Sequence, residues 1–241
     1  MENILNFDIV TTPGEVAYQQ SSEEMAVLFV LSIISEGYKE EPKYIEAIRK
    51  KCKQKDVAQI AIHIINRHYK RQEESAGRNH PLKRFEDLVD WKNNHTPFEG
   101  LENKDEYWLI CDRDNDSFTS EQYDQLVEKC QKEGVNIIIS NPAFQIWLLL
   151  HFTNDLSSYN LEQYEKSSDC IKQGIEPAIK AFEPRYRHGR LNVNTFLPLI
   201  KNAMDNSILY SHNIEELRDT IGTNFRVLLN RIEEVTQKEI F

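Results

Sequence analysis

Several features that mark common protein classes are missing from this chain of 241 residues. The longest apolar run, Met25 to Ile34, is too short to cross a bilayer, so no membrane-spanning helix is expected. The opening residues MENILNFDIV show neither a basic start nor a cleavage pattern, so we expect no secretion signal and a cytoplasmic location. The chain has only eight glycines and no G-x-S-x-G, G-x-x-x-x-G-K-[ST] or G-x-G-x-x-G motif, which argues against the common phosphate-cradling loops.

Paired cysteines and excess positive charge are missing too. The four cysteines are scattered, with no C-x-x-C pair and no histidine at zinc spacing, so we expect reduced thiols and no structural zinc. The net charge of −10 argues against a protein that coats DNA through many Lys and Arg contacts. It does not exclude a nuclease, because a metal-carboxylate site is itself acidic. Local basic stretches lie at residues 49–53, 67–71, 83–84 and 185–190, and the simplest interpretation of each is a solvated face or loop.

What the chain does contain is the alternation of an α/β fold. Four segments have the length and the β-branched or aromatic content of buried parallel strands: 26–34, 57–65, EYWLICD and VNIIIS. Helical segments separate them, which predicts a parallel sheet flanked by helices. Hydrophobic residues make up 40% of the chain, enough for one good core.

The helix boundaries carry recognisable signals. Pro42 stands at a plausible first helical position, with acids before it and bases after it, and residues 82–94 are also predicted to be helical. Thr119 and Gln122 have the spacing of a capping box, and Gly134 is placed to end that helix. In NPAFQIWLLLHF we expect a buried helix that begins with a cap and a first-turn proline.

These segments predict a division of the chain into three parts. Residues 1–24 are an N-terminal extension with little periodicity, and residues 25–155 form the α/β domain. Residues 156–241 form a mostly helical region packed on that domain and punctuated by prolines.

Acidic side chains follow two of the predicted strands. Glu36 ends one apolar run, and Asp112 and Asp114 follow another. Residues two apart in an extended segment face the same side, so both aspartates can point at one cation. Function in a parallel sheet gathers beyond the carboxyl ends of its strands. If the two strands are neighbours, three carboxylates converge and must bind cations or shift their pKa values.

Each of these residues also has a plain interpretation. Asp112 and Asp114 can belong to a turn, because Asp tolerates turn geometry, and a glutamate before Gly37 is usually a surface residue. The D-x-D-x-D spacing is that of a calcium-binding EF-hand loop, but Ser117 stands where Gly is needed and Tyr123 where Glu is needed.

Three further residues near these acids are candidates for substrate contact. Lys39 follows the glutamate turn, Arg113 lies between the aspartates, and Gln145 lies near the start of a helix that faces the strand ends. The simplest interpretation of Lys39 is a solvated lysine. For His151, on the same helix as Gln145, we expect a buried and satisfied polar group.

Three stretches in order, SEGYKEEPKYIEAI, LICDRD and ISNPAFQIWLLLHF, resemble the RloB-like family of bacterial phage-defence proteins. The segment TNFRVLLNRI resembles that family's closing helix. The resemblance implies a toprim-like metal-binding domain over residues 25–155, a fold shared by topoisomerases, primases and OLD-type nucleases. Glu36 then matches the toprim glutamate, and Asp112 and Asp114 match the Asp-x-Asp pair. The family pattern has an acid where this chain has Gln145.

The resemblance also implies a function and partners. We expect a nuclease dependent on Mg²⁺ or Mn²⁺ that acts on DNA or RNA, with tRNA among the possible substrates, as the effector of an antiphage or abortive-infection system. An ATPase encoded nearby is the implied partner. Glu36, Asp112 and Asp114 would be both the metal ligands and the catalytic residues. The alternative is a non-catalytic toprim-like module that binds or regulates the ATPase, which Gln145 and the net charge favour; nucleotidyl transfer is a third possibility.

Overall fold

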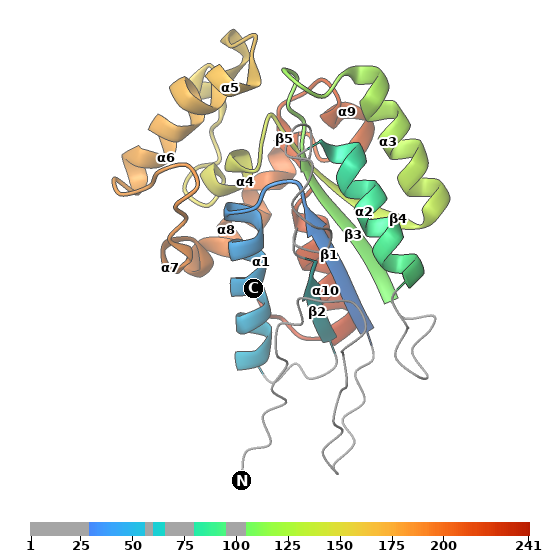
Figure 1. The fold of residues 1–241 in the computed structure, drawn as a ribbon. Helices are drawn as coiled ribbons and strands as arrows, with labels where there is room; N and C mark the ends of the chain where they lie inside the picture. The colour runs from blue at the N-terminus through green and yellow to red at the C-terminus, as the bar shows by residue number, and fades with distance from the viewer. Residues whose placement is uncertain (1–28, 56–59, 66–79, 95–104) are drawn as a thin grey trace.

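The structure is a computed structural model, and it describes residues 29–55, 60–65, 80–94 and 105–241. Its centre is a five-stranded sheet with the order β2-β1-β3-β4-β5 (Figure 1). The first four strands are parallel to one another: β1 (Phe29–Ser35), β2 (Ile60–Ile64), β3 (Asp105–Asp112) and β4 (Val135–Asn141). The predicted mixed α/β fold with a mostly parallel sheet is confirmed, although residues 26–28 and 57–59 of the predicted strands lie outside the described residues.

Side chains alternate between two apolar layers, one on each face of the sheet. On β1, Ile33 belongs to one layer and Ile34 to the other. Helices α1 (Glu40–Gln54), α4 (Gln145–Leu149), α6 (Glu176–Phe182), α8 (Ile200–Asn206) and α10 (Arg226–Thr236) contribute to the first layer. Helices α2 (Pro81–Asn94), α3 (Ser120–Glu133) and α9 (Ile214–Leu217) contribute to the second, as Figure 1 shows. The sheet is therefore buried on both faces, which explains its nearly continuous apolar strands.

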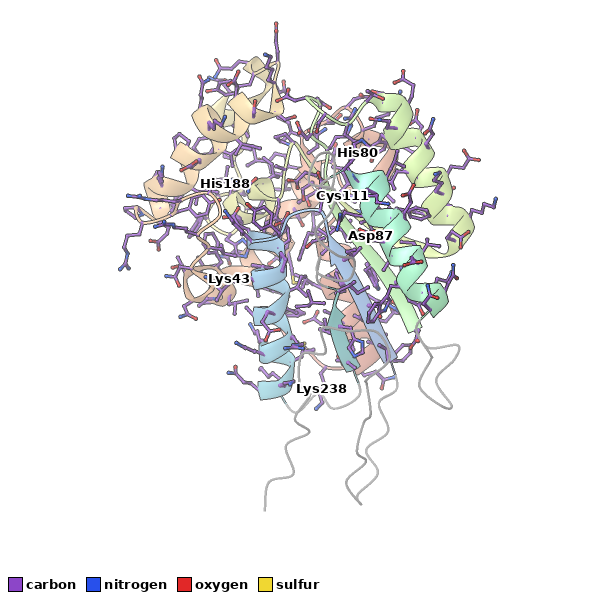
Figure 2. The ribbon with its side chains drawn as sticks, viewed as in Figure 1. Lys43, His80, Asp87, Cys111, His188 and Lys238 are labelled. Atoms are coloured by element: carbon purple, nitrogen blue, oxygen red, sulfur yellow. The ribbon has the colours of Figure 1, made fainter. Side chains whose placement is uncertain are left out.

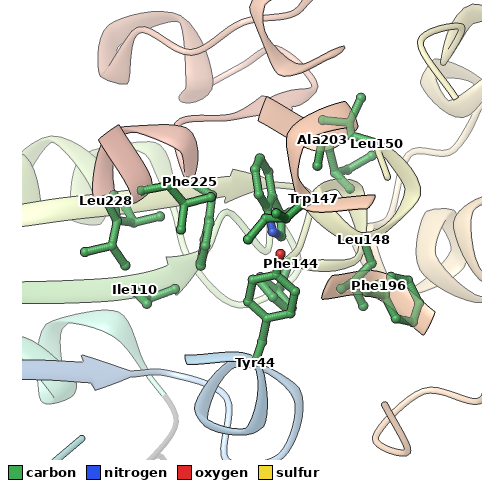
Figure 3. Packing of buried hydrophobic residues seen from close by; sticks show 14 of the residues in the cluster. Tyr44, Ile110, Phe144, Trp147, Leu148, Leu150, Phe196, Ala203, Phe225 and Leu228 are labelled. Atoms are coloured by element: carbon green, nitrogen blue, oxygen red, sulfur yellow. The ribbon is translucent and has the colours of Figure 1, made fainter. Parts of the chain in front are cut away.

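The larger layer is built around a group of aromatic rings (Figure 3). The rings of Trp147 and Phe225 stack with their centroids 4.9 Å apart, and Tyr44 meets Phe144 edge to face at 5.6 Å. His151 lies among them, with its Nε2 2.9 Å from the Tyr44 hydroxyl and its Nδ1 2.9 Å from the Trp147 carbonyl oxygen. His151 is thus the buried, satisfied polar group that the sequence predicts, and burial lowers its pKa to about 4.

Two helix starts differ from the sequence predictions. α1 begins at Glu40, so Pro42 is its third residue and not its first. Proline is tolerated there because the first four N–H groups of a helix have no partner within the helix. The earlier start places Glu40 and Glu41 in the first turn, where the helix dipole favours acids. The second case is the helix after β4, which starts later than predicted.

The predicted cap at Asn141 and Pro142 is wrong. Asn141 is the last residue of β4, pairs with Gly222, and donates from its side-chain amide to the Leu217 carbonyl oxygen at 2.9 Å. These contacts keep the chain extended, and the helix starts only at Gln145. The predicted burial of this helix is confirmed, since all five residues of α4 are buried.

The boundaries of α3 are as predicted. Gln122 N donates to Thr119 Oγ1 at 3.3 Å, and Thr119 N donates to Gln122 Oε1 at 2.9 Å, which completes the capping box. Gly134 ends the helix at φ 66°, in the left-handed region that favours glycine.

The region after residue 155 consists mostly of short helices, among them α5 (Ser167–Asp169), a π-helical segment (Cys170–Ile175) and α7 (Val193–Phe196). Four 3₁₀ turns connect them: Ser157–Tyr159, Leu161–Gln163, Leu197–Leu199 and Ser207–Leu209. It also supplies β5 (Gly222–Thr223), an edge strand antiparallel to β4. Asn224 extends this pairing, because Ile139 N donates to its Oδ1 at 2.6 Å.

No helix in the described ranges is long and apolar enough to cross a membrane.

Candidate functional site at the carboxyl edge of the sheet

The strand order creates a break in connectivity at the centre of the sheet. From β1 the chain crosses to β2 on one side, and it then returns to build β3 and β4 on the other side. Helices leaving β1 and β3 cover opposite faces, so the chain diverges at the carboxyl ends of these two strands. Open α/β sheets bind ligands in the crevice at such a switch point.

Glu36 and Asp112 meet at this point. Glu36 directly follows β1, and its backbone N–H donates to the Ile110 carbonyl oxygen on β3 at 2.8 Å. The backbone N–H of Asp112 donates in turn to Glu36 Oε2 at 3.1 Å. Two acids that lie 76 residues apart in the sequence are therefore neighbours. The structure brings together the two strand ends that the sequence analysis singled out.

The Asp112 carboxylate is crowded by other carboxylates. Loss of surrounding water raises the pKa of Asp112 well above its usual range, and the charges of Glu41, Glu36 and Asp114 raise it further. The backbone N–H of Phe144, which donates to Asp112 Oδ1 at 2.8 Å, opposes this shift. This one hydrogen bond reduces the upward shift in the pKa of Asp112 but does not reverse it.

Glu41 is a member of this acidic group that the sequence analysis missed. It is buried in the first turn of α1. Its carboxylate lies over the Cα of Gly37, so that a Cβ at residue 37 would collide with both carboxylate oxygens. The glycine after Glu36 is therefore needed to make room for a second acid.

Asp114 lies close enough to act on Asp112, but its own oxygens are engaged in a turn. Oδ1 accepts from the backbone N–H of Asp116 at 3.0 Å, and Oδ2 accepts from the Ser117 hydroxyl at 2.7 Å. This is the Asp-rich turn that was the plain interpretation of the motif. Asp114 is thus near the acidic group, while its hydrogen bonds are local.

Arg113 is directed away from this edge. Its Nε donates to the Arg218 carbonyl oxygen at 2.8 Å, and its terminal nitrogens donate to the Phe118 carbonyl oxygen and to Ser120 Oγ. The side chain is 3% exposed. These contacts hold the start of α3, which supports a structural role for Arg113, and its predicted substrate contact stays a prediction.

Gln145 lies at the edge, next to a second buried acid, Glu40. Gln145 Nε2 donates to Glu40 Oε2 at 2.5 Å and lies 3.2 Å from His188 Nδ1. The hydroxyl of Tyr186 donates to Glu40 Oε1 at 3.1 Å. Gln145 Oε1 is buried and has no hydrogen-bond partner among the residues that the structure describes. Glu40 thus accepts from neutral donors on two other parts of the chain.

The Tyr186 and His188 contacts place the basic stretch 185–190 beside the site. Figure 2 shows His188 on the C-terminal region, next to the start of α1. Lys39 packs against the same stretch, with its Cδ 3.1 Å from the point where a Cβ on Gly189 would lie. Gly189 has φ 77°, which favours glycine. Residues 185–190 are therefore more than a solvated stretch, because they contact the start of α1. Nothing in the sequence indicates that they fold back onto Lys39.

The residues that sequence reasoning missed carried weak signals. In the sequence, Glu40 and Glu41 indicate only a helix start, and Tyr186 and His188 belong only to a basic stretch. A carboxylate in a first helical turn is common, so its position alone does not separate a structural role from a functional one.

The chemistry of this donor group suits a hard divalent cation, since Glu36, Glu41, Asp112 and Asp114 offer carboxylate oxygens. Their side chains are not arranged as a finished ligand shell. Among the residues that the structure describes, no group of three or more His, Cys, Asp or Glu side chains is placed to hold a metal ion. Glu36 and Asp114 are turned to hydrogen bonds within the protein.

The fold and this edge define an α/β protein with a mostly parallel sheet and an acidic group at its switch point. A family model described as RloB-like protein matches residues 31–232, which is most of the chain. The chain belongs to the RloB-like family, as its three motifs predict. Comparison with curated proteins and with solved structures finds no match.

Proposed function

We propose that this RloB-like protein is a metal-dependent phosphodiesterase that cleaves nucleic acid. The observation that supports this most directly is the meeting of Glu36 and Asp112 at the switch point, with 3.1 Å between Glu36 Oε2 and Asp112 N. Burial raises the pKa of Asp112 and the neighbouring acids raise it further, so a bound cation would relieve their repulsion. A divalent cation beside a phosphate is the usual catalyst for phosphodiester cleavage.

The chain's own residues have distinct roles in this proposal. Asp112, Asp114 and Glu36 would hold Mg²⁺ or Mn²⁺, with Glu41 beside them, and Glu36 would serve either as a ligand or as the base that activates water. The cation, when bound, polarises the phosphate and stabilises the leaving oxygen. To hold the cation, Asp114 and Glu36 would have to give up their present hydrogen bonds. Lys39 contacts a phosphate of the substrate.

A cleavage assay with matched variants tests this function. Labelled DNA, RNA and tRNA are incubated with wild type, Glu36→Gln and Asp112→Asn, each in Mg²⁺, in Mn²⁺ and in EDTA. We expect divalent-dependent cleavage by wild type and a loss of about 10²-fold or more in each variant. Glu128→Gln, an exposed acid on α3, is the control and should cleave as wild type does. Equal cleavage by all four proteins would remove the proposal.

We also propose a biological role and a partner for this protein. As a family member the chain fits the effector half of a cytoplasmic antiphage or abortive-infection system, with an ATPase encoded nearby as its partner. Co-expression with that ATPase, followed by purification through a tag on one chain, tests the pairing. Recovery of the tagged chain alone would count against it.

A non-catalytic module for the ATPase partner is the second candidate. It is favoured by the local hydrogen bonds of Asp114 and by the neutral Gln145, where the family pattern has an acid. Titration calorimetry with Mg²⁺ and Mn²⁺ separates the two functions. Heat that disappears in Asp112→Asn supports the nuclease, whereas no binding at millimolar metal supports the module.

A further inference from the structure

An exposed aromatic ring lies in the short turn between Glu36 and helix α1. Tyr38 is two residues beyond Glu36, and 57% of its surface is exposed to solvent. Lys39 Nζ lies over the same ring, 4.9 Å from its centroid. A tyrosine ring that keeps most of its surface in water beside a charged site is placed to stack with a planar group.

Further exposed cations lie on the turn that packs against Lys39. The turn 185–190 contributes Arg187 and Arg190, and Arg190 N donates to the Arg187 carbonyl oxygen at 2.8 Å. Neither arginine, nor Lys39, forms an ion pair with any carboxylate in the described ranges. In a chain with a net charge of −10, such cations beside a carboxylate site are placed to attract an anion.

The basic turn is held in position by buried contacts. Tyr186, only 2% exposed, donates its hydroxyl to Glu40 Oε1 at 3.1 Å. Gly189 lies against the Lys39 side chain, with 3.1 Å between Lys39 Cδ and the position of a Cβ on Gly189. The ring, the lysine and the turn therefore form one surface attached to the start of α1. We call it the Tyr38 surface and define it as Tyr38, Lys39 and residues 185–190.

We propose that the Tyr38 surface binds single-stranded nucleic acid, with an unpaired base stacked on Tyr38 and flanking phosphates at Lys39, Arg187 and Arg190. Stacking on an aromatic ring combined with cations that follow the backbone is the general mode of single-strand binding. In a duplex both faces of each base are already covered, so Tyr38 would have no free base to stack on. This inference deepens the proposed function, because it names the substrate class of the same site.

Binding is measured by fluorescence anisotropy in EDTA, so that no metal-dependent cleavage occurs. The probes are labelled single strands of RNA and of DNA, of about 12 nucleotides, and the matching duplexes. We expect both single strands to bind wild type more tightly than the duplexes do. Tyr38→Ala should weaken single-strand binding about tenfold, whereas Tyr38→Phe, which keeps the ring, should bind as wild type does.

A second variant tests the charges independently of the ring. The double variant Arg187→Ala/Arg190→Ala should bind about tenfold more weakly at low salt. Its affinity should also fall less steeply with salt, by about 0.7 in logarithmic slope for each phosphate that the variant no longer neutralises. The charge-matched control is Lys129→Ala/Lys132→Ala on α3, where both lysines are exposed, and it should match wild type.

Three results would overturn the proposal: no single-strand binding by wild type, equal binding of duplex and single strand, or wild-type binding by both Tyr38→Ala and the double arginine variant. Competition by polyglutamate as strong as by the oligonucleotide would also overturn it, because charge alone would then explain binding. Failure of the proposed function looks different: single strands bind through Tyr38, but wild type cleaves nothing in Mg²⁺ or Mn²⁺.

Discussion

Two carboxylates at the same edge of this molecule have opposite surroundings. Glu40 receives hydrogen bonds from Gln145 and Tyr186, and His188 Nδ1 lies 3.9 Å from its Oε2. Asp112 receives one hydrogen bond from Phe144 N, and its other strong neighbours are acids that raise its pKa. Donors around a buried acid stabilise the fold, whereas crowding among acids destabilises it unless a cation is bound.

The comparison suggests a division of roles. The Glu40 contacts join α1, α4 and the turn 185–190, so they hold separate parts of the chain together. The Asp112 group joins the ends of two central strands and retains excess negative charge. We infer that the first region is a structural anchor and that the second is available for a ligand. Changing the charge in each region tests this contrast.

The largest effect should come from making the Glu40 region resemble the Asp112 region. Gln145→Glu places a carboxylate against Glu40 Oε2, which now lies 2.5 Å from Gln145 Nε2. We expect the free energy of unfolding in urea to fall by on the order of 4 kcal/mol at neutral pH, because a second carboxylate is buried against the first. Stability should recover as the pH falls, because a proton taken up by either carboxylate removes the repulsion. Gln163→Glu, at an exposed position, is the control. Equal stability of the two variants would show that the surroundings of Glu40 do not stabilise the fold.

His151 provides a reference for a satisfied buried group among aromatic rings. Its pKa is lowered from 6.5 to about 4, so the folded state binds fewer protons than the unfolded state in this range. Stability should therefore be complete above pH 6.5 and should decrease by about 3 kcal/mol as the pH falls toward 4. Unfolding in urea across this pH range measures the decrease. The stability of His151→Gln should depend less steeply on pH. An equally steep dependence would show that His151 does not cause the decrease.

Removing the charge of Glu40 should destabilise the anchor. In Glu40→Gln one of the two carboxylate oxygens becomes an NH2 group, which then faces a donor from Tyr186 or Gln145. We expect a decrease of about 2 kcal/mol in the free energy of unfolding. Glu128→Gln serves again as the exposed control. A variant as stable as wild type would show that Glu40 is not an anchor.

Replacing the Asp112 carboxylate by an amide should stabilise the protein, unlike Glu40→Gln, and this should be the smallest of the four effects. Asp112→Asn keeps an oxygen that accepts from Phe144 N and removes a charge from the acidic group. In EDTA at neutral pH we expect the Tm to rise by about 2–4 °C, the shift that 1 kcal/mol produces in a chain of this size. Because the pKa of Asp112 is raised, this gain should shrink as the pH falls. A lower Tm for Asp112→Asn in EDTA would show that the charge of Asp112 does not destabilise the fold.

The sequence was most informative about elements with strong local patterns. The apolar runs of β1, β3 and β4 predicted buried strands, and Thr119, Gln122 and Gly134 predicted the ends of α3. β5 could not be predicted, because Gly222 and Thr223 have no strand pattern and pair only after the C-terminal region folds back onto β4. The cap at Asn141 failed for the same reason, since Leu217 and Gly222 hold that residue in the strand.

Some residues of the candidate site could likewise be predicted from the sequence, and others could not. Glu36 and Asp112 were predictable, because Glu36 follows β1 and Asp112 ends β3 in a parallel sheet. Glu41 was not, since its place over Gly37 depends on where α1 begins. For Arg113 the sequence and the structure point to different roles. Its position between Asp112 and Asp114 suggested the site, but its side chain packs at the start of α3.

The sequence by itself determined the alternating α/β pattern, the acids at two strand ends and the family, because these depend on local periodicity and on short motifs. Only the tertiary structure decided that β1 and β3 are neighbours and that Glu41 joins Glu36 and Asp112. It also decided that the turn 185–190 lies against Lys39. The physical reason is that strand order and long-range packing arise from burial over the whole chain, which no single stretch of residues encodes.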